Sequence, residues 1–567
     1  MLSSAPPPYL LADVEVLVVD CQTTGASPSY GSVLELGWCV AKASDPQLET
    51  AAQAHWIVPP PGEHISAQVR QLTGFEESVL SAALEPAQAW QQLRRLMPET
   101  SAMPAAIHFA RFELSFLRDW SQRFEPSTAF PIEAVCVHAI ACRLYPDLPR
   151  RNLRALAGFL GHGLHLERRS LGHVQATAFI WRKLVGTLAE RGITTWPELA
   201  SWLASPERPA APRKRKYPLA PARYRSLPDE PGVYRFLRSN GDVLYVGKAT
   251  SLKKRVSSHF TKQSGATERA LEMLTQVSEV AFEPTSTALE AALLETQTIK
   301  LINPPYNVQL IQGERGVWFS SGDLATISPE PDAQHRFGPL SSRYSLRSLH
   351  ALTQLLADKS LTPGRRAAAV GAPLRWAPDE QSFSEGWAQF LGRHVTNRAL
   401  PSDPRQRALR VARCLRLSAE PEAEPELETD AAARPSVWDG PRVCRHLERA
   451  VAQNFQVLRR AAWLCLLASS AVCYREPGSS VNRYLVLAQA ELIESGILAD
   501  DTSPPAPSGR GERLAALGSF DAARYDSLRI LTTELKRIQR DGGSVAVRLS
   551  ATRTLTGTWL AGVLRLV

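Results

Sequence analysis

Between residues 234 and 295 the chain carries, in order, side chains that together suit the hydrolysis of a phosphodiester. A carboxylate can hold a divalent metal against the scissile phosphate, and Arg and Lys can stabilise the negative charge added during the reaction. A phenol or an imidazole can position or deprotonate the attacking water. The residues of these types are Tyr234, Tyr245, Lys248, Arg255, His259 and Glu295.

The two tyrosines lie on a predicted β-hairpin. The segment GVYRFLRSNGDVLYVGK reads as strands at residues 232–238 and 243–247, joined by an Asn-Gly dipeptide of the kind favoured in two-residue turns. This turn predicts that Phe236 faces Tyr245. The two-residue period of a strand then places Tyr234 on the same face as these two aromatics, and we expect that face to lie opposite the core.

A cationic helix is predicted directly after the hairpin. Ser251 can cap a helix that carries Lys253, Lys254, Arg255 and His259. Arg255 and His259 are one turn apart, so their side chains share one face of this helix.

A second helix is predicted to carry the carboxylate. Ser286 or Thr287 can open it, and it runs through LEAALLETQTIKLI, which includes Glu295. The helical neighbours of Glu295 are all uncharged, and a carboxylate on such a packed face needs a cation. These neighbours are Ala291, Ala292, Thr298 and Ile299.

Together these segments resemble the GIY-YIG nucleases of the UvrC/Cho excinuclease type. The resemblance covers roughly 85 residues in family order, and its motifs are specific. Gly232-Val-Tyr234 and Tyr245-Val-Gly247 correspond to the GIY and YIG motifs after which the family is named. The further matches are LPDEPGVY from Leu227, LYVGKATSLKKRVSSHF from Leu244, LLETQTIK from Leu293 and NPPYNV from Asn303.

The resemblance implies a role for each matching residue. It makes Tyr234 and Tyr245 the active-site phenols, Arg255 the phosphate-stabilising cation, Lys248 a supporting cation, Glu295 the ligand of Mg²⁺ or Mn²⁺, and Asn307 a site-shaping amide. His259 departs from the family, which usually has tyrosine there, and an imidazole can act as proton acceptor or base. The cations expected to contact nucleic acid are Arg213, Lys214, Arg215, Lys216, Lys253 and Lys254.

The N-terminal block resembles a DnaQ-like (DEDD) 3′–5′ exonuclease of RNase H-like fold. The matching segments are VVDCQTTG, IHFARFELSFL and SLGHVQATAFIWRKL. The family places four carboxylates and a histidine around two divalent metals. The corresponding positions here are Asp20, Gln22, Glu113, His173 and, for the histidine, Arg168. Two carboxylates beside an added arginine cannot compensate two divalent ions, so we expect this exonuclease site to be inactive.

Length and composition give the number of domains. The chain has 567 residues, 42 of them proline, and 44% are hydrophobic. This length predicts roughly three to four domains, and the composition excludes wholesale disorder. The net charge is +9, with 15 Lys or Arg against 9 Asp or Glu between residues 213 and 313. This excess favours an anionic partner.

Two compositional breaks divide the chain into an α/β multidomain protein. We expect a DnaQ-like domain at 1–204, a basic Pro-rich linker at 205–226, the small α/β GIY-YIG domain at 227–312, a UvrC/Cho-like connecting region at 313–417, an acidic linker at 418–435 and a mixed α/β C-terminal region of unknown role at 436–567. Helices are predicted near 440–468 and 520–540, and strands near 482–490 and 544–549. No second nuclease site is evident, so one incision per molecule is expected.

The sequence predicts a cytoplasmic protein. None of its eight cysteines forms a CxxC pair, which argues against zinc ribbons and thioredoxin-like sites and is typical of a reducing compartment. The N-terminus lacks a basic region and a cleavage site, so it does not read as a signal peptide. The longest uncharged stretch, residues 461–474, is shorter than the roughly 20 residues that a membrane span needs.

Three functions remain open from sequence. The first is a metal-dependent DNA endonuclease of nucleotide excision repair that acts on damaged double-stranded DNA, with the UvrA/UvrB damage-recognition proteins as partners. The second is a working 3′–5′ exonuclease of the proofreading type in the N-terminal block. The third is a non-catalytic DNA-binding adaptor that recruits repair partners.

Overall fold

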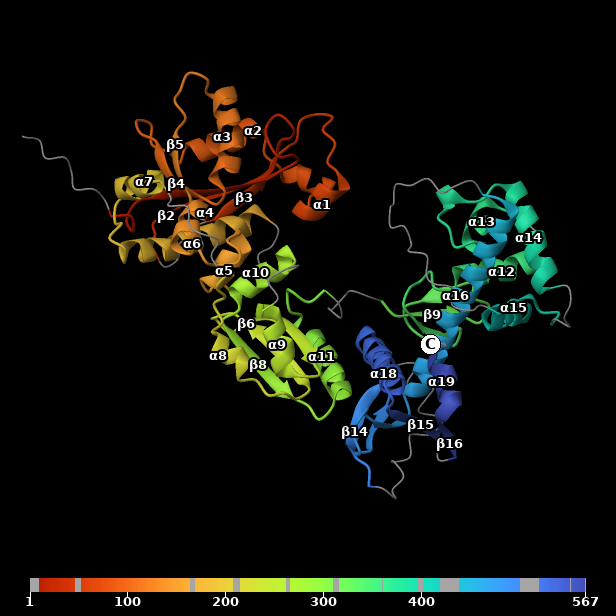
Figure 1. Cartoon of the computed structure of the whole chain (residues 1–567). Coiled ribbons are helices and arrows are strands. Elements are labelled where there is room, and N and C mark those ends of the chain that lie inside the picture. Colours follow the sequence, from red (N-terminus) through yellow and green to blue (C-terminus); the bar gives the residue numbers. More distant parts are fainter. Residues whose placement is uncertain are drawn as a thin grey trace, which may run out of the picture. The chain divides into compact units, whose positions relative to one another are not determined.

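The computed structural model shows two compact units (Figure 1). One comprises Met1–Ser286 with Pro304–Val308, and the other Thr287–Asn303 with Gln309–Val567. No helix in the described ranges is long and apolar enough to cross a membrane. The described residues are 10–45, 52–163, 169–206, 215–261, 266–308, 316–358, 360–395, 401–418, 438–499, 520–550 and 552–565.

The first unit begins with a five-stranded sheet of RNase H-like arrangement, as the sequence predicted. Its order is β3-β2-β1-β4-β5; β2 runs antiparallel to β1 and β3, whereas β4 and β5 run parallel to β1. The strands are β1 (Val16–Thr23), β2 (Val33–Ala41), β3 (Gln53–Trp56), β4 (Met103–Ile107) and β5 (Ile132–Cys136). The apolar run at the start of β1 is buried on both faces, which is typical of a sheet covered on two sides.

Helices cover both faces of this sheet (Figure 1). One core joins α2 and α3 to Leu17 and Val19, and the other joins α4, α5, α6 and α7 to Val16 and Val18. The helices of this part are α1 (Ala67–Thr73), the 3-10 helix η2 (Glu77–Ala82), α2 (Pro86–Arg94), α3 (Ala110–Phe124), α4 (Val137–Leu144), α5 (Leu153–Phe159), α6 (Ser170–Ala189) and α7 (Trp196–Ala204).

The predicted hairpin forms the centre of the GIY-YIG region. Strands β6 (Gly232–Leu237), β7 (Val243–Ala249) and β8 (Glu279–Pro284) make an antiparallel sheet of order β7-β6-β8, in which Phe236 faces Tyr245 as predicted. The expectation that the aromatic face lies opposite the core is wrong. Tyr234 and Phe236 are fully buried with Phe260, because α9 (Leu252–Thr261) covers that face.

The folded region begins before residue 227. The helix α8 (Pro221–Arg225) lies within the predicted linker, and Leu219 and Tyr224 are buried in the same core as Tyr234. Tyr224 stacks on Phe260 with ring centroids 4.8 Å apart. Four cations of this linker were expected to contact nucleic acid. Arg215 and Lys216 are exposed, whereas Arg213 and Lys214 lie outside the described residues.

The second unit contains a helical lobe beside a small three-stranded sheet. The strands are β9 (Trp318–Ser321), β10 (Ile327–Ser328) and β11 (His335–Leu340). The helices that share its core are α12 (Arg347–Ala357), α13 (Pro363–Ala369), α14 (Glu380–His394), α15 (Pro404–Ser418) and the first part of α16 (Gly440–Leu467), with the 3-10 helix η3 (Leu374–Trp376) between α13 and α14. The predicted acidic linker lies mostly outside the described residues.

The rest of this unit is an antiparallel α/β module. Its sheet has the order β14-β13-β12-β15-β16, with strands β12 (Ala471–Arg475), β13 (Arg483–Ala488), β14 (Glu491–Ile497), β15 (Ser544–Ser550) and β16 (Arg553–Leu555). Helices α18 (Ala522–Arg540) and α19 (Gly557–Arg565) pack on it. The predicted elements near 440–468, 482–490, 520–540 and 544–549 are thereby confirmed.

Two helices cross the boundaries expected from sequence. The first part of α16 packs into the helical lobe through Val443, and its last part packs into the α/β module through Trp463. Residues 313–417 and 436–567 are therefore not separate bodies. The helix α11 (Ala288–Ile302) was expected to belong wholly to the domain at 227–312, but its Leu289 and Leu293 are buried in the core of the α/β module.

Candidate active site

The centre of the candidate site is a hydrogen bond between a buried phenol and an imidazole. The hydroxyl of Tyr234 on β6 lies 2.8 Å from Nε2 of His259 on α9. Burial, and to a lesser extent the charge of Arg255, lowers the pKa of His259 from 6.5 to about 4. His259 is therefore neutral near pH 7, and a neutral imidazole can accept the proton of the phenol through Nε2.

Arg255 lies one turn before His259 and interacts with both phenols. The pKa of Arg255 is raised, mainly by electrostatic interaction with the Tyr234 phenol. Hydrogen bonds to Tyr234 and Tyr245 raise this pKa further, whereas burial lowers it. The helix is placed by its first turn, where Ser251 Oγ accepts from the backbone N–H of Lys254 at 3.2 Å, as predicted. The structure thus brings Tyr234, Tyr245, Arg255 and His259 together.

Asn307 holds the strand that carries Tyr245. Its Oδ1 accepts from the backbone N–H of Val246 at 3.0 Å, and its Nδ2 donates to the carbonyl of Val246 at 2.9 Å. These two bonds fix the backbone between Tyr245 and Gly247. Lys248 follows on the same strand, and Lys253 and Lys254 are exposed on α9.

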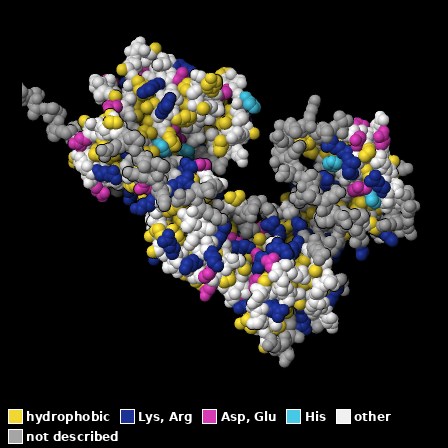
Figure 2. Space-filling view, in the orientation of Figure 1, with side chains coloured by type: hydrophobic (Ala, Val, Ile, Leu, Met, Phe, Trp, Pro, Cys, Tyr) yellow, Lys and Arg dark blue, Asp and Glu magenta, His cyan; other side chains and the backbone are white. Residues whose placement is uncertain are grey.

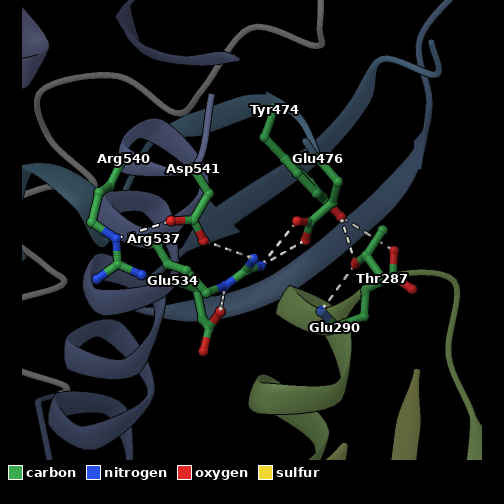
Figure 3. Close-up of polar contacts among 8 residues, drawn as sticks. All are labelled: Thr287, Glu290, Tyr474, Glu476, Glu534, Arg537, Arg540 and Asp541. Carbon is green, nitrogen blue, oxygen red and sulfur yellow. Dashed lines mark hydrogen bonds and ion pairs between the residues drawn. The ribbon is translucent and has the colours of Figure 1, made fainter. Parts of the chain in front are cut away.

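Glu295 lies on α11, which the second unit anchors at both ends. Thr287 caps the helix by accepting from the backbone N–H of Glu290, as one of the two predicted caps. The Tyr474 hydroxyl contacts Thr287 Oγ1 at 3.2 Å and donates to Glu290 Oε1 at 3.3 Å (Figure 3). Near the other end, Lys300 forms a buried ion pair of 2.7 Å with Asp526 of α18.

A second ion-pair cluster stabilises the module that holds α11. Figure 3 shows the Arg537 guanidinium between the carboxylates of Glu476 and Glu534. Arg537 donates to both Glu476 oxygens at 2.9 and 3.0 Å and to Glu534 at 2.7 Å. Because Glu476 directly follows β12, this cluster ties the Tyr474 strand to α18.

Sequence reasoning missed a polar network that joins the GIY-YIG region to the exonuclease-like region within the first unit. The hydroxyl of Tyr306 donates to Glu272 and accepts from Gln276, both at 2.6 Å. Asn152, the residue that caps α5, donates to the other oxygen of Glu272 at 2.7 Å. Tyr306 directly precedes Asn307, so the network is continuous with the two hydrogen bonds that Asn307 makes to the backbone of β7. Its only sequence signal was the NPPYNV motif, since Glu272 and Gln276 lie on α10 (Glu268–Gln276), which no motif singled out.

A buried arginine extends this interface. Arg238 is 6% exposed, donates to Gln276 Oε1 at 3.0 Å and approaches the carbonyl of His162 at 3.4 Å. Gly158 of α5 packs so closely that an added Cβ would overlap Gln276 Oε1. Only glycine, which has no Cβ, permits such an approach. The two regions of the first unit are therefore closely packed against each other.

Four of the predicted exonuclease residues, Asp20, Gln22, Glu113 and His173, also converge. His173 Nδ1 lies 3.2 Å from Asp20 Oδ1 and 3.4 Å from the Gln22 amide. Burial opposes protonation of His173, yet its hydrogen bond to Asp20 and the charge of Asp20 raise its pKa overall. Burial, followed by the charge of Asp20, raises the pKa of Glu113, whose Oε2 accepts from the Cys21 N–H at 2.8 Å. Arg168 lies outside the described residues.

This cluster does not offer the charge that two divalent ions require. Two of the four carboxylate positions of the family hold Gln22 and His173, and His173 is hydrogen-bonded to Asp20. Among the described residues, no group of three or more His, Cys, Asp or Glu side chains is placed to hold a metal ion. The loss of exonuclease chemistry stays a prediction.

The family model of the UvrC-like GIY-YIG domain matches residues 230–308. UvrABC system protein C of Alkalilimnicola ehrlichii is 41% identical over 130 residues, which is 22% of this chain and 21% of that protein. The corresponding protein of Legionella pneumophila strain Paris is 51% identical over 85 residues, or 15% of this chain and 13% of that protein. The chain contains a UvrC-like GIY-YIG domain.

One relative is similar over a longer stretch. A Mycobacterium tuberculosis protein named as a putative bifunctional exonuclease/endonuclease is 30% identical over 251 residues, which is 43% of this chain and 38% of that protein. The chain thus spans well under half the length of these curated relatives.

Two solved structures are also similar in part. The GIY-YIG N-terminal endonuclease domain of UvrC from Thermotoga maritima, bound to its catalytic magnesium, is 33% identical and covers 15% of this chain and 93% of its own, with a TM-score of 0.14. Exonuclease I of E. coli, in complex with a dA16 oligonucleotide, is 13% identical and covers 39% of this chain and 48% of its own, with a TM-score of 0.27.

Proposed function

We propose that this protein is a metal-dependent DNA endonuclease of nucleotide excision repair, similar to Cho and UvrC, which hydrolyses one phosphodiester near a lesion. The observation that carries the proposal is the cluster of Tyr234, Tyr245, Arg255 and His259 inside the matched residues 230–308. The cluster joins a proton acceptor, two phenols and a cation, the groups that phosphodiester hydrolysis uses.

In this proposal His259 and Tyr234 move the proton. Water attacks the phosphorus while its proton passes to the Tyr234 oxygen, and the phenol proton passes to Nε2 of the neutral imidazole. The bond from phosphorus to the leaving oxygen then breaks, and solvent protonates the leaving group. Arg255 stabilises the negative charge that develops on the phosphate oxygens, Lys248 supports it, and Asn307 keeps Tyr245 in place by holding β7.

Glu295 is proposed as the protein ligand of Mg²⁺ or Mn²⁺. A single carboxylate fits Mg²⁺, which is commonly bound by one or two carboxylates together with waters and substrate phosphates. When bound, the cation would polarise the scissile phosphate.

We infer that the exonuclease-like region acts as a scaffold for DNA or for a partner, because Gln22 and His173 occupy two positions where the family has carboxylates. The substrate proposed is damaged double-stranded DNA in the cytoplasm, presented by the UvrA/UvrB proteins. These finer statements rest on the similarity to UvrABC system protein C over the GIY-YIG region.

The test uses the full chain and a lesion-containing duplex, with and without damage-loading proteins, in Mg²⁺ or Mn²⁺. We expect discrete internal incision that falls at least about 100-fold in Glu295→Gln and is unchanged in Asp20→Ala, since loss of a metal ligand or charge-stabilising group costs this order of rate. Incision by Glu295→Gln at the wild-type rate contradicts the endonuclease proposal. Shortening of a labelled 3′ end that is lost only in Asp20→Ala would instead establish the exonuclease. DNA binding without cleavage in either Mg²⁺ or Mn²⁺ would favour the non-catalytic adaptor function.

A further inference from the structure

Two adjacent helices of the helical lobe concentrate positive charge. α15 and α16 together carry ten arginines and one glutamate, a net charge of +9, which equals the charge of the whole chain. α15 packs on the lobe through the buried residues Ala408, Val411 and Ala412, so its arginines Arg410 and Arg413 are exposed on the opposite face. Figure 2 shows dark-blue Lys and Arg side chains on the visible face of this lobe.

The outer face of α16 is a continuous stripe without an acid. Its residues recur every three or four positions, which places them on one side of the helix. From the first to the last, the stripe is about 27 Å long at 1.5 Å per residue. It contains only arginines and glutamines: Arg442, Arg445, Arg449, Gln453, Gln456 and Arg460.

Several cations of this surface lie close enough to lower one another's pKa. In addition to burial, the charge of Arg413 lowers the pKa of Arg459, and the charge of Arg460 lowers that of Lys536 on α18. Exposed arginines such as Arg123 and Arg540, by contrast, have a carboxylate partner. Five arginines of this surface make no hydrogen bond or ion pair within the described part of the chain: Arg410, Arg413, Arg445, Arg449 and Arg459.

We propose that this face of α15 and α16 binds the phosphate backbone of double-stranded DNA independently of base sequence. A duplex carries one charge per about 1.7 Å, so roughly a dozen phosphates or more lie along the length of the stripe. Arginine and glutamine side chains are common phosphate contacts. The stripe has no aromatic residue on which unpaired bases could stack, which favours a duplex over a single strand. The choice of DNA as the polyanion rests on the proposed endonuclease function.

The experiment measures binding of the full chain to a lesion-free fluorescent duplex by anisotropy, in EDTA, over a range of NaCl concentrations. The test variant is Arg413→Gln/Arg445→Gln/Arg449→Gln, which removes three exposed cations that have no carboxylate partner within the described part of the chain. The matched control is Arg70→Gln/Arg123→Gln/Arg540→Gln, which removes three cations that each have a carboxylate partner. Circular dichroism and thermal unfolding of both variants check the fold.

We expect the test variant to bind at least about tenfold more weakly near 0.1 M salt, and the slope of log affinity against log salt to fall by about 2 to 3. The control is expected to stay within about twofold of the wild type. Equal affinity and slope in the two variants would overturn the proposal, as would wild-type binding that is insensitive to salt or stronger for a single strand. Binding is read in EDTA without cleavage, so its result does not depend on incision. A failed endonuclease and a failed binding surface are thereby distinguished.

Discussion

The neutral state of His259 makes a quantitative prediction about acid. Its pKa is lowered from 6.5 to about 4, chiefly by burial. The unfolded chain therefore binds more protons than the folded chain between these two values. The stability that His259 contributes is present above pH 6.5 and is lost as the pH falls toward 4. The difference corresponds to about 3 kcal/mol in favour of the neutral imidazole.

If His259 accepts the Tyr234 proton, the same pKa determines how the rate of incision falls at acid pH. At pH 5.5 a group with this pKa is about 3% protonated, whereas an unperturbed histidine is about 90% protonated. We expect the rate lost through His259 between pH 7.5 and 5.5 to be only a few per cent. An ordinary histidine in the same role would remove roughly nine tenths of the activity over this range.

Two measurements check this prediction. Exchange of the imidazole C2 hydrogen, followed by mass spectrometry of the peptide that contains His259, gives the pKa of that residue in the full chain. Initial rates of incision between pH 5 and 7.5 give the acid limb. A midpoint near 6.5 in the exchange measurement would refute the argument from burial. A flat exchange profile with a rate that halves near pH 6.5 would show that another group is the acceptor.

A double-mutant cycle serves as the control for the proton path. Tyr234→Phe and His259→Phe each remove one end of the 2.8 Å hydrogen bond. Groups that act as a unit show strongly non-additive effects on rate, so the double variant should be little slower than the slower single variant. Multiplicative losses in the double variant would contradict a shared path.

Two further substitutions test how the site is supported. Gly158→Ala places a methyl group against Gln276, which is buried and cannot move aside without breaking its hydrogen bonds. We expect it to destabilise the contact between α5 and α10 by about 1–3 kcal/mol, seen as faster amide exchange in both helices, and unchanged exchange there would contradict the close packing. Asp526→Ala leaves the ammonium of Lys300 buried without its 2.7 Å ion pair and should cost about 3–5 kcal/mol in the second unit. It should also raise the Mg²⁺ concentration needed for incision, whereas Asp119→Ala, at an exposed pair of the first unit, should do neither.

The local elements could be predicted from sequence because they follow from short-range physics. The Asn-Gly turn set the hairpin register, so the pairing of Phe236 with Tyr245 was correct. Ser251 and Thr287 were identified as helix caps from their residue type and place. The convergence of Asp20 and His173, 153 positions apart, came from a family resemblance and not from local pattern.

The errors have a common origin in tertiary packing. A two-residue period cannot tell whether a second layer covers the outer face of a sheet, so the burial of Tyr234 under α9 was not foreseen. The network of Tyr306, Glu272 and Gln276 joins two regions through ordinary polar residues, which have no spacing that marks them. Likewise, the continuous motif order at 227–312 concealed that α11 completes another core.

The C-terminal α/β module contributes to the nuclease region by holding α11. Leu289 and Leu293 are buried in the module's core, and Tyr474 and Asp526 hold the two ends of the helix. The helix that carries Glu295 is therefore fixed by residues that lie more than a hundred positions downstream. The phenols, by contrast, are held by the first unit through Asn307 and α9. Because the proposed metal ligand and the proposed proton path depend on different units, a substitution in the C-terminal core can alter metal dependence while the pKa of His259 stays unchanged.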